Sequence, residues 1–76
     1  MIYSLSSLKD KIVKNLKIQI IKSNEPDLQN NLYRWGIALK EVFVKNGPWG
    51  SFILYSNEQE IAISPLLAKD LKVQIV

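Results

Sequence analysis

The most regular feature of the sequence is an alternation of apolar and polar residues that occurs twice, near the beginning and at the end. Residues 14–21 and residues 69–76 carry Lys, Leu, Lys, Gln and Ile at matching places. Both segments are rich in β-branched side chains, and alternation of this kind predicts a strand with one buried face. We expect two strands of one sheet that lie at or near its edges, each with an outer row of Lys and Gln.

Two further segments alternate in the same way and form the clearest hairpin of the chain. Residues 49–55 predict one strand, Ser56-Asn57-Glu58-Gln59 predicts the turn, and residues 60–64 predict the returning strand. Residues 65–69 begin with proline and indicate a short helical turn before the last strand.

Helical spacing appears first in residues 4–15. Leu5, Leu8 and Ile12 fall on one face of this segment, and the serines before them are suitable capping residues. The spacing changes to a period of two beyond Leu16, where the first repeat strand begins. We therefore predict a short N-terminal helix.

A longer helix is predicted after Pro26, which suits a first helical turn. Apolar residues keep helical spacing from Leu28 to Phe43, and Asn46-Gly47-Pro48 is a typical stop. Residues 33–45 also alternate as in a strand, so the sequence leaves both interpretations open there, with the caps favouring a helix. As a helix it has a second apolar stripe, which indicates burial on both sides, in part by another subunit.

These elements predict an α+β fold. We expect one domain over residues 1–76, with a short N-terminal helix, one longer helix and a mixed sheet of about four strands covered by helices on one face. A small all-β, barrel-like domain is the alternative.

Composition narrows the possible chemistry. A hydrophobic content of 47% is typical of a folded protein, and the chain has no cysteine and no histidine. The usual general base, the thiolate nucleophile and the commonest transition-metal ligands are therefore missing. The glycines form no phosphate-binding fingerprint. We predict a protein that is not an enzyme and uses no cofactor and no metal. The absence of a leader-like or spanning segment favours the cytoplasm and makes a membrane partner unlikely.

The charge is mild but unevenly distributed. The net charge is +3, and lysines prevail before residue 25. A basic face made of Lys9, Lys11, Lys14 and Lys17 suits an anionic partner, although solvated surface lysines explain it equally well.

The remaining candidate surface is aromatic. Aromatic residues beside Arg and Lys are typical of protein-binding hot spots and of sites for single-stranded nucleic acid, and also of an ordinary core. The candidate partner-binding residues are Tyr33, Arg34, Ile37, Val44, Trp49 and Tyr55.

We predict a non-catalytic protein–protein interaction module, a small regulator or adaptor that also associates with its own copies. The C-terminal strand, through Leu71, Val73, Gln74 and Ile75, is the predicted self-association edge. The alternative is a small nucleic-acid-binding protein that uses the basic face and exposed aromatic residues.

Overall fold

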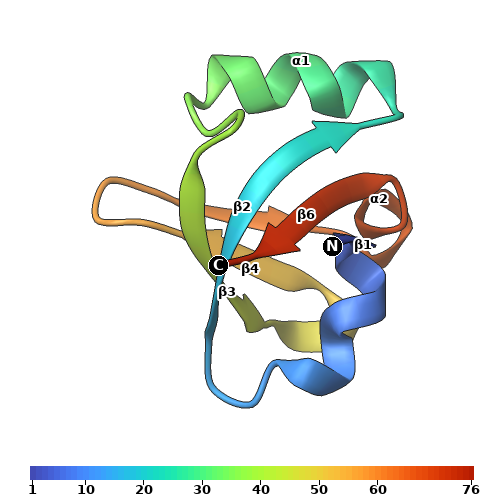
Figure 1. Ribbon diagram of the computed structural model, residues 1–76, viewed down its shortest axis with the longest axis vertical. Helices are drawn as coiled ribbons and strands as arrows, with labels where there is room; N and C mark the ends of the chain where they lie inside the picture. The colour runs from blue at the N-terminus through green and yellow to red at the C-terminus, as the bar shows by residue number, and fades with distance from the viewer.

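A computed structural model describes residues 1–76 and contains one six-stranded sheet (Figure 1). The strands are β1 (Ile2–Ser4), β2 (Leu16–Ser23), β3 (Glu41–Asn46), β4 (Phe52–Tyr55), β5 (Glu60–Ile63) and β6 (Leu71–Ile75). The helical segments are η1 (Leu5–Lys11), α1 (Pro26–Arg34), η2 (Pro48–Gly50) and α2 (Pro65–Ala68). The arrangement agrees with an α+β class. The sheet, however, has six strands instead of about four, and every pairing is antiparallel instead of mixed.

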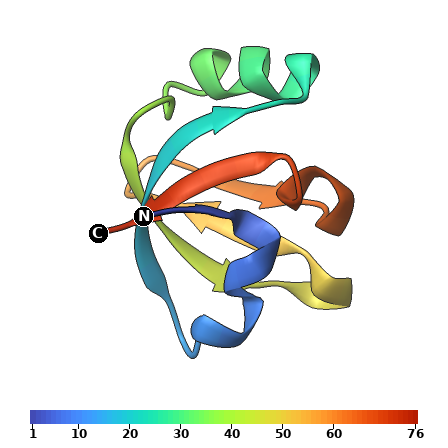
Figure 2. The same ribbon diagram turned by 45° about the vertical axis from the view of Figure 1, so that its right-hand side comes forward.

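The sheet is strongly curved but does not close into a barrel (Figure 2). Its strand order is β1-β6-β2-β3-β4-β5, so β1 and β5 are the two edges, and they do not pair with each other. A single cluster of 16 buried apolar residues fills the concave side. Helix α1 lies at one end of the molecule, and η1 and η2 lie at the other (Figures 1 and 2).

The two repeat strands pair directly with each other, in the interior of the sheet. Gln19 lies opposite Gln74, and these are equivalent positions of the repeat. On either side of this pair, Ile20 lies opposite Val73 and Ile18 lies opposite Ile75. Neither repeat strand is an edge: β6 lies next to the edge strand β1, so it is near an edge as predicted, whereas β2 is the third strand and lies farther inside than predicted. The short strand β1 covers the outer side of β6, and β3 covers β2.

The long predicted helix is divided into a helix, a turn and a strand. Helix α1 ends at Arg34 because Gly36 adopts a left-handed conformation with φ +75°. The N–H of Ile37 donates to the carbonyl of Leu32 at 3.0 Å, and the N–H of Gly36 donates to that of Tyr33 at 3.0 Å. This pair of hydrogen bonds is the Schellman motif, which ends many helices at a glycine. The helical interpretation was therefore right up to Arg34, and the strand interpretation was right from residue 41.

The other elements agree with the sequence. The hairpin of β4 and β5 is confirmed, with Leu54 opposite Ile61 and the turn over residues 56–59. Its first strand begins at Phe52 and not at residue 49, because Pro48–Gly50 form η2. The N-terminal helix is confirmed as the 3₁₀ segment η1, and its Leu5 and Leu8 are buried. The bend after proline is helix α2. In α2 the Ser64 hydroxyl accepts from the N–H of Leu67.

Candidate functional site

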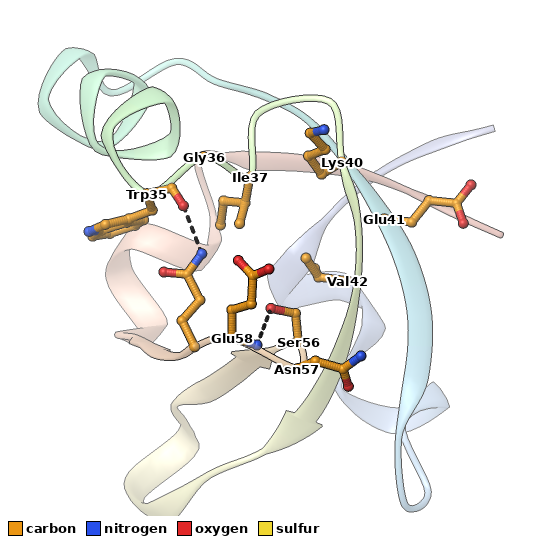
Figure 3. A pocket seen from close by; sticks show the side chains of 10 residues that line it. Trp35, Gly36, Ile37, Lys40, Glu41, Val42, Ser56, Asn57 and Glu58 are labelled. Carbon is orange, nitrogen blue, oxygen red and sulfur yellow. Dashed lines mark hydrogen bonds between the residues drawn. The ribbon is translucent and has the colours of Figure 1, made fainter.

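The largest hollow of the surface lies between the α1–β3 connection and the β4–β5 turn (Figure 3). Its volume is about 370 Å³, within the range of ligand-binding clefts. Ile37 and Val42 supply apolar surface, and Ser56, Asn57 and Glu58 supply polar groups from the turn. The carboxylate of Glu58 points into this space (Figure 3).

A second hollow of about 290 Å³ continues the first onto the outer face of the sheet. The two hollows share Glu41, Val42, Ser56 and Asn57 as lining residues. We refer to them together as the joined hollows. Their shared residues make a continuous depression, which runs from the end of α1 across the start of β3 to the end of β4.

Aromatic side chains border the outer part of the joined hollows. The rings of Phe43 and Tyr55 stack, with centroids 5.7 Å apart and an interplanar angle of 24°. The Nζ of Lys45 lies 5.1 Å from the centroid of Tyr55, and this contact orients the ring. Lys17 lies opposite Phe43 on β2 and forms an ion pair of 3.3 Å with Glu41. Glu41 therefore neutralises Lys17, whereas Lys45 forms no ion pair.

Two side-chain hydrogen bonds hold the loop that forms one wall. The Nε2 of Gln59 donates to the carbonyl of Trp35 at 2.7 Å (Figure 3) and ties the β4–β5 turn to the end of α1. The Nε2 of Gln19 donates to the carbonyl of Leu39 at 3.2 Å. Leu39 itself has φ +62° and a largely exposed side chain. The connection is thus held in a conformation that a leucine adopts only at a cost.

In the structure some of the predicted partner-binding residues are buried and others are exposed. Ile37 and Val44 are both buried in the core. Ile37 still borders the first hollow, whereas Val44 lines neither hollow, so burial argues against a partner contact for Val44. Tyr33 is 65% exposed near the end of α1, and Arg34 beside it is also exposed. Tyr55 is half-buried in the aromatic stack.

Trp49 lies far from the other predicted partner-binding residues. It belongs to the β3–β4 turn, whereas the joined hollows reach the β4–β5 turn at the opposite end of β4. The sequence therefore grouped side chains of two separate surfaces.

The predicted basic face is also divided. Lys9 and Lys11 belong to η1 and Lys14 to the loop that follows it, and all three are exposed. The Nζ of Lys11 lies 4.9 Å from the ring centroid of Tyr3. Lys17 instead lies on the outer face of the sheet beside Glu41.

The predicted self-association edge is not an edge. Leu71 and Val73 are fully buried in β6, Ile75 is half-buried, and only Gln74 of the four is exposed. Strand β6 has β1 on one side and β2 on the other, so its backbone groups already have partners. The reason is that residues 2–4 at the start of the chain form β1, which pairs with β6 along the side that would otherwise be free.

Three residues of the joined hollows were not predicted from the sequence: Phe43, Asn57 and Glu58. Phe43 was assigned to the buried stripe of a helix, and the alternation of Glu41, Phe43 and Lys45 was the signal for an outward-facing row. In the sequence Asn57 and Glu58 look like ordinary turn residues, because the neighbouring residues do not indicate which other part of the chain the turn will lie against.

Neither protein-family models nor the curated proteins give a match to this sequence. The structure holds no cluster of three or more His, Cys, Asp or Glu side chains placed to bind a metal ion. None of its helices has the length and apolar character that spanning a bilayer requires.

Proposed function

We propose that the protein is a non-catalytic interaction module that binds an extended segment of a partner protein in the joined hollows. The observation that carries the proposal is the continuity of the two hollows from Ile37 over Val42 to the stack of Phe43 and Tyr55. The first hollow is lined mainly by polar groups and the second adds the exposed aromatic surface of Phe43, so the depression combines hydrogen-bonding groups with an apolar contact, as recognition sites do.

The residues that line the joined hollows indicate which side chains the bound partner segment should carry. Phe43 is 40% exposed although its ring stacks on Tyr55, so one apolar side chain of a partner can cover the remaining surface. Asn57 presents an amide at the centre of the depression, and Glu58 presents a carboxylate. The best partner is therefore an extended segment with an apolar residue next to a hydrogen-bonding or positively charged one.

A test starts from peptides selected from a displayed random library and measured by fluorescence anisotropy. Phe43→Ser removes the aromatic contact and should weaken a selected peptide by about 2 kcal/mol, roughly 30-fold. The matched control is Leu66→Ser, because Leu66 is 73% exposed on α2, away from the depression. This control should leave the affinity unchanged.

Amide chemical shifts measured with the peptide locate the site. We expect the largest changes in residues 35–43 and 55–59. Failure to select any peptide, or changes that lie away from these residues, contradicts the proposal.

Association between copies, where it occurs, is proposed through β5 instead of β6. The N–H of Ser56 donates to the carbonyl of Gln59 at 2.9 Å, which sets the alternation of bonded pairs along the hairpin. The alternation directs the backbone groups of Glu60 and Ala62 away from β4, towards the free edge. A second β5 added across this edge would give a symmetric pair.

Sedimentation at high protein concentration tests this edge. Ala62→Pro removes only an outward N–H, so it should abolish a dimer while the fold remains. Ala62→Ser is the control and should keep the dimer. A wild-type protein that sediments as an 8.7 kDa monomer at every concentration removes self-association from the proposal.

A further inference from the structure

The β3–β4 turn displays a tryptophan almost completely. Trp49 is 94% exposed, the highest exposure among the large hydrophobic side chains. It also has φ 55° and ψ 37°, a left-handed conformation that is unfavourable for a non-glycine residue. Asparagine or glycine adopts this conformation more readily. Neither packing nor backbone preference therefore accounts for a tryptophan at this position.

The turn that carries Trp49 is rigid. The hydroxyl of Ser51 donates to the carbonyl of Pro48 at 2.7 Å, and the N–H of Ser51 donates to the same oxygen at 3.1 Å. The N–H of Gly47 donates to the carbonyl of Ser51 at 2.9 Å and closes the loop. Because these hydrogen bonds hold the turn in place before binding, a ligand that contacts the indole binds at a lower cost in conformational entropy.

The segments that carry Lys9 and Lys14 lie against this turn, and the Lys9 side chain reaches it. The Nδ2 of Asn46 donates to the carbonyl of Ile12 at 3.1 Å and reaches that of Lys9 at 3.5 Å, so η1 and the loop after it are held against the turn. The Nζ of Lys9 lies 3.5 Å from the point that a Cβ on Gly50 would occupy. The positive charge of Lys9 is thus next to the residue that follows Trp49.

The lysines of this region have no carboxylate partners. The only ion pair of the structure joins Lys17 to Glu41 on the outer face of the sheet, so Lys9, Lys11 and Lys14 form none. Asp10 is the one acidic residue of η1, and it is exposed. The local charge is therefore positive, and it is available to an anionic ligand.

We propose that the Trp49 turn is a binding site for single-stranded nucleic acid, separate from the joined hollows. An unpaired base stacks on the exposed indole, and the phosphates beside it contact the ammonium groups of Lys9 and Lys14. A flat aromatic surface next to lysines is the combination with which proteins hold single strands, because each base has a π face and each nucleotide a negative charge. A duplex buries its base faces and leaves the indole without a partner.

Fluorescence anisotropy of a labelled single-stranded dT12 oligonucleotide at low salt tests the site. Stacking is worth about 1–3 kcal/mol per base, so Trp49→Ala should weaken binding roughly 5- to 150-fold. Lys9→Gln and Lys14→Gln should each weaken binding and lower the slope of log affinity against log salt by about 0.7. The intrinsic fluorescence of Trp49 should be quenched on binding.

Matched controls use side chains of the same kind elsewhere. Tyr33→Ala removes an exposed aromatic ring from α1, and Lys72→Gln removes a lysine from the outer face of β6, where Gln74 also lies. Neither change should alter the affinity for dT12. Circular dichroism of each variant confirms that it is folded.

Three outcomes overturn the proposal. The first is an absence of dT12 binding by the wild-type protein at low salt, and the second is binding that Trp49→Ala leaves unchanged. The third is Trp49-dependent binding to phosphatidylserine vesicles without binding to dT12, which identifies a lipid surface as the anionic partner. Peptide binding in the joined hollows is measured separately, so its failure and the failure of this site are distinguishable.

Discussion

Replacement of Ile20 by alanine tests the central finding of the fold, that the two repeat strands pair inside the sheet. Ile20 is fully buried on β2 and lies opposite Val73, which is fully buried on β6. The change removes three carbon groups, worth about 0.8 kcal/mol each or roughly 2.4 kcal/mol in transfer free energy. The cavity left behind adds to this, so we expect a loss of about 3–4 kcal/mol.

This loss is large for a chain of 76 residues. Its whole free energy of unfolding should be roughly 4–11 kcal/mol at 0.05–0.15 kcal/mol per residue. Urea denaturation followed by far-UV circular dichroism measures the change. With a slope of about 1 kcal/mol per molar urea, the midpoint should fall by roughly 3 M. The control is Val13→Ala, a 90% exposed position where the change should stay within about 0.5 kcal/mol.

A double-mutant cycle examines the pairing itself. Because Ile20 and Val73 face each other across neighbouring strands, their alanine variants should not be additive, and the coupling should be about 0.5–3 kcal/mol. Strict additivity would refute the proposed pairing. A loss below about 1 kcal/mol for Ile20→Ala would refute its burial.

Two other substitutions examine how the elements are connected. Gln74→Pro should prevent folding, because β6 is paired on both sides and proline removes a hydrogen-bond donor from a strand inside the sheet. A cooperative melting transition like that of the wild type would contradict this expectation. Asn46→Ala removes the amide that holds Ile12 and Lys9, so it should lower the free energy of unfolding by about 1 kcal/mol. It should also increase hydrogen exchange in residues 12–15, and unchanged exchange there would show that the loop is held by other contacts.

The elements that the sequence predicted correctly have local causes. The alternation in β2, β5 and β6, the hairpin turn and the proline that opens α2 depend on residues close to one another in the chain. The end of α1 was also visible in principle. Gly36 is the left-handed residue of the helix stop, but an apolar spacing that happened to continue beyond it favoured a longer helix.

The site was less predictable than the elements, because surfaces join residues from distant segments. The joined hollows combine the α1–β3 connection with a turn that follows β4. The Trp49 turn lies beside Lys9, and an Asn46 side chain next to that turn bonds across 34 residues to the carbonyl of Ile12. The spacing of apolar and polar residues along the chain does not indicate contacts between segments this far apart.

The sequence by itself determined that this chain forms strands with one buried face, a helix on either side of the first repeat strand, and no site with cysteine or histidine chemistry. These properties follow from side-chain type and near-neighbour spacing. The tertiary structure decided which strands are edges, which apolar residues remain exposed and which lysines lie beside Trp49. The physical reason is that a strand with one apolar face fits equally well at many positions of a sheet. Its place is chosen only when the whole core is packed and β6 pairs with β1 on one side and with β2 on the other.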